Sequence, residues 1–181
     1  MGLLTPYDDE WPGKFTAEAT RLSDALGDRV LRIEHVGSTS IPSLRAKPII
    51  DIQISVASVT PLDPFIESLA PLGYAHLSLP DPGDDVYPFF HRPASWPTTH
   101  HVHLCQAGGL QERKHLAFRD WLRNHAEDRD TYARLKQELA DETDASDPLA
   151  VFRYTAGKVD WITQMTERAL ESSSEVGGCP E

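Results

Sequence analysis

The segment from Ile49 to Val56 alternates apolar and polar residues without interruption, and this pattern strongly constrains the fold. Apolar side chains occupy one face, and Asp51, Gln53 and Ser55 occupy the other. Period-two alternation is typical of a β-strand with one face in the core. The isoleucine-rich flanks favour a central place in a sheet, where the lone carboxylate of Asp51 needs a partner or a metal. An ordinary solvated position on an edge strand is the alternative.

Just upstream, a turn of small residues precedes this strand. A short hydrophobic strand is expected from Val30 to Val36, and Gly37, Ser38 and Thr39 follow it directly. The backbone amides of such a turn can hold an anion. Lys47 lies between the turn and the second strand, and the proline after it favours an extended conformation. A phosphate-binding site is one reading of this grouping, and a serine-capped turn is the other.

The same residues carry a family resemblance. The segment IEHVGSTSIPSLRAKPIIDI resembles the signature of the GrpB family, small proteins placed in the nucleotidyltransferase superfamily and also found fused to some bacterial dephospho-CoA kinases. The resemblance continues through THHVHL, HLAFRDWLRNH and YARLKQELA to a terminal helix with Tyr154 and Lys158. It implies an α/β (α+β) fold with a mixed, mostly antiparallel β-sheet flanked by helices, and a helical C-terminal portion that closes over the active face.

The resemblance also implies an activity. The superfamily pattern is a Gly-Ser turn followed by a strand that bears Asp-x-Asp/Glu. By this resemblance Gly37–Thr39 would bind a nucleoside triphosphate, and Asp51 would hold Mg²⁺ or Mn²⁺ during nucleotidyl transfer to a small-molecule acceptor. Gln53 stands where the second carboxylate of the pattern would be, and Ser43 stands where the family usually has glycine. The first departure bears on catalysis and the second on turn geometry.

A second concentration of chemistry lies in a strand expected from His100 to Gln106. His101, His103 and Cys105 share one face of it, so two imidazoles point the same way about 7 Å apart. That geometry serves a metal, a phosphate or proton transfer. The resemblance places His103 where the superfamily has a third, catalytic carboxylate, so we expect Asp51, His101 and His103 as metal ligands. Alternatively, one histidine caps a loop and the other fills a polar gap.

Basic residues able to meet a phosphate are few. Lys47 is close to the motif in sequence, and the resemblance adds Arg119 from the HLAFRDWL segment and Lys158 near the C-terminus. The alternatives without a phosphate are that Arg119 forms a salt bridge and that Lys158 lies at a solvated helix end.

Two other functions remain open at this stage. A non-catalytic module of the same fold would bind a nucleotide or a coenzyme A-like ligand, and Gln53 favours it because an amide does not replace an anionic oxygen on a second metal. A histidine-dependent phosphoesterase would use the face with His101 and His103. The histidine triad motif itself fails at Cys105.

Composition limits the partners that we expect. The formal net charge of −11 argues against DNA or RNA as a partner, because proteins that bind nucleic acids normally have a basic face. Two cysteines are too few for a disulfide framework. The sequence shows no apolar run of membrane-spanning length and no signal peptide, so we expect a soluble cytoplasmic protein. We expect a single domain over residues 1–170, with a disordered tail over 171–181.

Apolar periodicity predicts the remaining elements. Helices are expected over residues 11–26 and 62–72, around 116–122 and 132–139, and from 151 to 165. Further strands are expected over residues 74–79 and 86–92.

Overall fold

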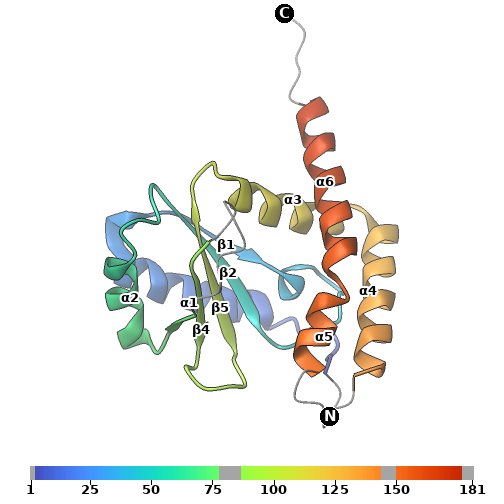
Figure 1. The fold of residues 1–181 in the computed structure, drawn as a ribbon, viewed down its shortest axis with the longest axis horizontal. Coiled ribbons are helices and arrows are strands. Elements are labelled where there is room, and N and C mark those ends of the chain that lie inside the picture. The colour runs from blue at the N-terminus through green and yellow to red at the C-terminus, as the bar shows by residue number, and fades with distance from the viewer. Residues whose placement is uncertain (1–2, 78–86, 144–149, 177–181) are drawn as a thin grey trace, which may run out of the picture.

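The structure, a computed structural model, describes residues 3–77, 87–143 and 150–176. A five-stranded sheet lies at its centre, with helices packed around it (Figure 1). The strands are β1 (Val30–Val36), β2 (Ile50–Val56), β3 (Ala75–Leu77), β4 (Phe89–Arg92) and β5 (His100–Gln106). The helices are α1 (Trp11–Leu26), α2 (Asp63–Leu69), α3 (Leu110–Asn124), α4 (Ala126–Asp141), α5 (Ala150–Ala156) and α6 (Val159–Val176). The predicted α/β fold with a helical C-terminal portion is confirmed.

The sheet is mixed and mostly antiparallel, in the order β1-β2-β5-β4-β3. Only β2 and β5 run parallel, and the other three pairs in the described sheet are antiparallel. In the β2–β5 register Asp51 lies opposite His101, and Gln53 lies opposite His103. Paired residues in a sheet project to the same face, so this register brings the carboxylate and both histidines together.

The other face of β2 forms the main core. Ile52 and Ile54 are fully buried against Trp11 and Leu22 of α1 and Phe65 of α2. Full burial of a side chain of this size contributes about 1.5–3 kcal/mol. This packing fixes the orientation of β2, and it leaves the polar face of the strand directed toward the C-terminal helices.

A second cluster attaches the helical portion to the segment that follows β1. Ile41 and Leu44 are buried against Leu122 of α3 and Tyr132 of α4. α6 packs across α3, as Figure 1 shows. The helices therefore cover the polar side of the sheet, as the family resemblance implied.

The C-terminal helices differ from the expected pattern. Apolar periodicity predicts one helix over residues 151–165, but the chain forms α5 and α6, separated at Gly157. A Cβ atom at Gly157 would lie 2.6 Å from Cδ2 of Leu139, so glycine here permits close packing on α4. α6 continues through Val176, beyond the predicted start of a disordered tail at residue 171. Ser173 donates to the Ala169 carbonyl at 2.8 Å, which satisfies its hydroxyl within the helix.

The strand ends differ slightly from the predictions. β1 and β5 match their predicted ranges, and β2 begins at Ile50. β4 begins at Phe89, directly after Pro88, because proline has no N–H for a ladder. Residues 78–79 and 86 of the predicted strands, and residues 177–181 of the predicted tail, lie outside the described residues. Within the described part of the chain, no helix combines the length and apolar character required to cross a membrane.

Candidate functional site

Asp51 lies on the polar face of β2 directly against the turn after β1. Gly37 opens this turn with φ 66° and ψ −173°, a backbone conformation that favours glycine. A Cβ atom there would lie only 2.3 Å from Oδ2 of Asp51. The glycine therefore lets the turn and the carboxylate meet, and it places Ser38 beside Asp51 at the rim of a cavity.

Both predicted histidines contact Asp51. His101 Nδ1 lies 3.2 Å and His103 Nε2 lies 3.4 Å from the same oxygen, Oδ1. Thr98 Oγ1 lies 2.9 Å from the second nitrogen of His101 and holds that ring in place. Burial alone would raise the pKa of Asp51, but the hydrogen bonds and charges of the two imidazoles outweigh it and hold that pKa well below its usual range. Asp51 is thus an ionised acceptor and a weak base.

Three lysines gather on one side of Asp51. They line a cavity of about 230 Å³, here called the lysine cavity. Its lining residues are Ser38, Lys47, Ile49, Asp51, His101, Lys136, Tyr154, Thr155 and Lys158. Lys47 and Lys158 place their ammonium groups 4.6 Å and 4.1 Å from the centroid of the Tyr154 ring, within cation–π distance. The cavity combines small size with strong positive charge.

The lysines have depressed pKa values. Burial, with the neighbouring positive charges, lowers the pKa of Lys136 to about 7 and that of Lys158 to about 8, and burial also lowers the pKa of Lys47. Lys136 is almost fully buried, and its ammonium group donates to the carbonyl oxygen of Arg45. Adjacent buried ammonium groups repel one another, so an anion placed between them would relieve the repulsion.

A larger cavity also borders Asp51. It measures about 510 Å³ and is here called the second cavity. Its walls are largely apolar and include Phe118, Tyr132 and Ile162, and His103 and His115 also line it. Ser38, Asp51, Thr155 and Lys158 line both cavities. Asp51 therefore stands where a compact cationic space meets a wider apolar one.

Most of the predicted site residues gather here, but two have other partners. Gly37, Ser38, Lys47 and Lys158 line one or both cavities together with Asp51, His101 and His103. Thr39 is buried, and its hydroxyl donates to the Ile49 carbonyl at 3.0 Å while His35 contacts it at 3.0 Å. Arg119 donates to Glu34 and Asp120, each at 2.7 Å, and it does not line either cavity. Phosphate binding by Thr39 and Arg119 stays a prediction.

The sequence did not identify Lys136 and His115 as site residues. Lys136 follows Tyr132 by four residues, so both lie on one helical face, and a lysine on an apolar face is a detectable signal. His115 Nδ1 lies 2.9 Å from Oε1 of Gln53, which joins α3 to the middle of β2. Nothing local in the sequence predicts that long-range contact.

The donor chemistry does not match a pair of magnesium or manganese ions. Those ions select several oxygen ligands, whereas Oδ1 of Asp51 accepts from His101 and His103, and Oε1 of Gln53 accepts from His115. A ring nitrogen that donates to a carboxylate carries a hydrogen and has no lone pair for a metal. The predicted ligands Asp51, His101 and His103 are therefore together as a hydrogen-bonded cluster, and the described residues contain no group of three or more His, Cys, Asp or Glu side chains placed to hold a metal.

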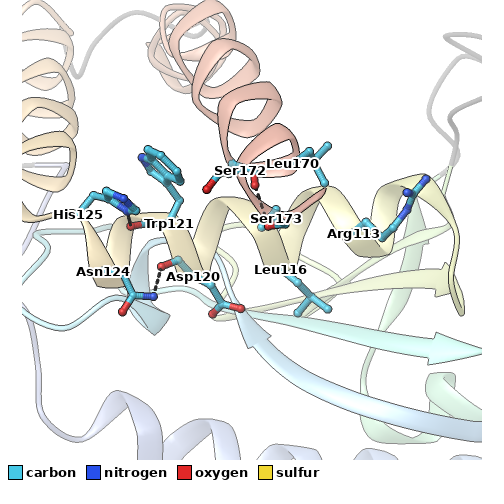
Figure 2. Close-up of a pocket in the computed structure, with 11 residues that line it drawn as sticks. Arg113, Leu116, Asp120, Trp121, Asn124, His125, Leu170, Ser172 and Ser173 are labelled. Carbon is cyan, nitrogen blue, oxygen red and sulfur yellow. Dashed lines mark hydrogen bonds between the residues drawn. The ribbon is translucent and has the colours of Figure 1, made fainter. Parts of the chain in front are cut away.

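A further cavity of about 460 Å³ lies between α3 and the end of α6, where Figure 2 shows its lining side chains. Trp121 stacks on His125 with centroids 3.6 Å apart, and Asn124 donates to the Asp120 carbonyl at 2.8 Å. These polar groups bond within α3 rather than converge on the space. Asp51 and the lysines do not line this cavity.

Comparisons with known proteins agree with the resemblance in the sequence. The model of the family described as GrpB protein matches residues 3–168. The UPF0157 protein YqkA of Bacillus subtilis is 36% identical over 163 residues, which cover 90% of this chain and 46% of that protein. A dephospho-CoA kinase of Mycolicibacterium paratuberculosis is 31% identical over 199 residues, with 98% of this chain and 48% of the kinase covered. The chain thus spans about half the length of these two relatives.

A solved structure is similar over almost its whole length. The crystal structure of the conserved protein GrpB from Enterococcus faecalis has a TM-score of 0.82 and 32% identity, covering 94% of this chain and 98% of that chain. The arrangement of sheet and C-terminal helices described above is therefore a shared fold.

Proposed function

The chain belongs to the GrpB family, and we propose that it transfers a nucleotidyl group from a nucleoside triphosphate to a small-molecule acceptor. The phosphates lie in the lysine cavity, and the acceptor lies in the second cavity. Asp51 and His103 stand between the two substrates.

One observation carries the proposal: two cavities of different chemistry meet at Asp51. At about 230 Å³ the lysine cavity is smaller than a typical pocket for a drug-sized ligand, but it is suited to a phosphate chain. The second cavity, at about 510 Å³, is within the usual range for a small molecule. The junction is where a bond between the two substrates would form.

The charges support phosphates over other ligands. A triphosphate is strongly anionic, and Lys47, Lys136 and Lys158 offer cations that lack enough acidic partners within the cavity, where Asp51 is the carboxylate among the lining residues. An approaching anion favours the charged form of each lysine and repays part of its desolvation. Ser38 adds a hydroxyl at the rim.

The protein's own groups then have separate roles. The acceptor oxygen forms a bond to the α-phosphorus, the bond to pyrophosphate breaks, and the lysines offset the charge that develops on the phosphate oxygens. Asp51 orients His101 and His103 through its Oδ1 atom. Because its pKa is held low, Asp51 acts as a fixed negative charge and not as the base. The proposed reaction uses no metal ion, because the side chains around Asp51 do not fit a pair of metal ions.

A second candidate function has its own support. The neutral amide of Gln53, and the similarity to part of a dephospho-CoA kinase, favour a module that binds a nucleotide or a coenzyme A-like ligand without reacting. The same two cavities would then hold the phosphates and the rest of the ligand.

Product analysis separates these functions. The protein is incubated with mixed nucleoside triphosphates and candidate acceptors, with and without magnesium or manganese. Transfer releases pyrophosphate and joins the nucleotidyl group to the acceptor, whereas hydrolysis by a histidine-dependent phosphoesterase releases a monophosphate. Binding without either product supports the second candidate.

Two variants make the assay specific to the site. Lys158→Met should weaken triphosphate affinity at least tenfold, because one charge-assisted contact is worth about 1.5–3 kcal/mol. Lys14→Met is the matched control, since Lys14 pairs with Asp8 and Glu10 on the exposed side of α1. Equal triphosphate affinities in the two variants would show that the phosphates do not bind in the lysine cavity.

A further inference from the structure

His115 lines the second cavity and contacts Gln53. Its Nδ1 atom lies 2.9 Å from Oε1 of Gln53, and an amide oxygen only accepts hydrogen bonds, so Nδ1 carries the hydrogen. Burial lowers the pKa of His115 to about 3, so the ring is neutral and has a single N–H. The other nitrogen, Nε2, is then a lone-pair acceptor.

The surroundings hold this ring firmly. His103, His115 and Tyr87 contact one another edge-on or tilted, with centroids 5.0–5.4 Å apart. All three line the second cavity, and so do the apolar side chains of Phe118 and Ile162. A ligand here meets walls that are largely apolar, and Nε2 of His115 adds a neutral nitrogen acceptor among polar side chains that include Lys114 and Glu167. An alcohol with an apolar body suits such a cavity.

We propose that the second cavity binds the acceptor substrate as an alcohol, whose hydroxyl donates to Nε2 of His115, and that Gln53 is the positioning residue that fixes this tautomer. The inference rests on the proposed function and specifies the acceptor. Gln53, which stands where the superfamily pattern has a carboxylate, then has a physical role: its amide orients the hydrogen-bond acceptor His115 instead of binding a metal.

The transfer step then balances. The alcohol oxygen bonds to the α-phosphorus of the triphosphate as the bond to pyrophosphate breaks, and the hydroxyl proton leaves with the pyrophosphate. Nε2 of His115 accepts the hydrogen bond of the hydroxyl and orients its oxygen but does not take the proton, because a ring with a pKa of about 3 is too weak a base. The products are a phosphodiester of the alcohol and pyrophosphate.

The tautomer is directly measurable in the full-length chain. Nitrogen-15 spectra of labelled histidine should show His115 as the Nδ1–H form, with Nε2 in the range of an unprotonated nitrogen. Gln53→Met, of similar size and without an acceptor, should lose that preference, and Gln53→Glu should retain it. An Nε2–H tautomer in the wild-type protein would overturn the proposal without any variant.

Matched fragments test the ligand class. We expect 2-phenylethanol to bind in the second cavity about threefold to tenfold more tightly than ethylbenzene, the difference made by one neutral hydrogen bond. His115→Asn keeps a side-chain N–H near the position of Nδ1 but has no counterpart of Nε2, so it should bind both fragments equally. Equal affinities in the wild-type protein, or an undiminished alcohol preference in His115→Asn, would refute the role of Nε2.

The two proposals fail separately. Affinity for a non-hydrolysable triphosphate, measured in Lys158→Met, reports on the lysine cavity and not on His115. The triphosphate could fail to bind while the alcohol preference and its dependence on His115 are observed. That result would support the alcohol site and refute nucleotidyl transfer. If the triphosphate binds and the alcohol preference is absent, the acceptor assignment falls alone.

Discussion

Gly37 and Asp51 pack so closely that no side chain fits between them. A Cβ atom at position 37 would lie 2.3 Å from Oδ2 and 2.7 Å from both Cβ and Cγ of Asp51. Contacts this short force a displacement, and the neighbour here is a short side chain on a central strand. The position of the carboxylate and the conformation of the turn are therefore one structural unit.

Gly37→Ala should consequently damage both stability and function. Its backbone, with φ 66° and ψ −173°, lies in a region that essentially only glycine adopts, which costs an alanine about 1–3 kcal/mol, and the displacement of Asp51 adds to that cost. We expect a decrease of more than about 2 kcal/mol in the free energy of unfolding, together with weaker triphosphate binding. Thermal unfolding and calorimetric titration measure the two effects.

Gly27→Ala is the matched control for this experiment. Gly27 has a similar backbone, with φ 58° and ψ −140°, but a Cβ atom added there would have nothing within 4 Å, so its substitution reports the backbone cost alone. Equal losses of stability in the two variants, with intact triphosphate binding in Gly37→Ala, would show that the contact with Asp51 is unimportant.

Ser43 provides the opposite case. It has a positive φ of 67°, at the position where the family resemblance leads us to expect glycine. Ser43→Gly should raise the free energy of unfolding by about 0.5–1 kcal/mol, because relief of about 1–2 kcal/mol of strain exceeds the added chain entropy. For a chain of this size the melting temperature should rise by about 1–4 °C. Ser43→Ala keeps the strain and should change little; a comparable gain from alanine would point to a cause other than φ.

These positions show how far the sequence leads. Alternation alone located β2 and β5, because a period of two is a local property of a strand. The contact of Asp51 with His101 required the parallel pairing of two strands separated by a long crossover. The family resemblance implied that His103 lies near Asp51, but neither it nor the local pattern predicted this register. Lys136 was overlooked because its burial depends on the segment around Arg45, far away in sequence.

The partners of Asp51 define its expected contribution to stability. The sequence indicated that the carboxylate needs a partner or a metal, and His101 and His103 are those partners. Asp51→Asn should lower the free energy of unfolding by about 1–3 kcal/mol near neutral pH, because two partly buried donors lose an ionised acceptor.

The pH dependence of that loss follows from the depressed pKa of Asp51. A carboxyl group whose pKa is lower in the folded state stabilises the protein fully above its unfolded pKa, near ~3.9, and progressively less below it. The difference in urea midpoint between wild type and Asp51→Asn should begin to shrink below about pH 4, where the carboxyl group of the unfolded chain is protonated. A difference that stays constant or grows between pH 4 and pH 3 would contradict the carboxylate's assigned state.

Anion affinity should change over a pH range in which ordinary surface lysines stay largely charged. Lys136 and Lys158 have pKa values of about 7 and 8, so both are largely charged at pH 6 and largely neutral at pH 9.5 in the free protein. Binding of an anion at high pH therefore requires proton uptake, and affinity falls as pH rises. The other charged or titratable groups that line the cavity are Lys47, Asp51, His101 and Tyr154.

Sulfate is the suitable probe because its own charge is constant over this range. We expect its affinity to fall at least tenfold between pH 6 and 9.5, and the fall to be smaller in Lys136→Met, which retains only part of the titrating charge. Lys14→Met, with its lysine on the exposed surface, should behave as wild type. A flat profile between pH 6 and 9.5, or an unchanged slope in Lys136→Met, would mean that the buried lysines do not receive the anion.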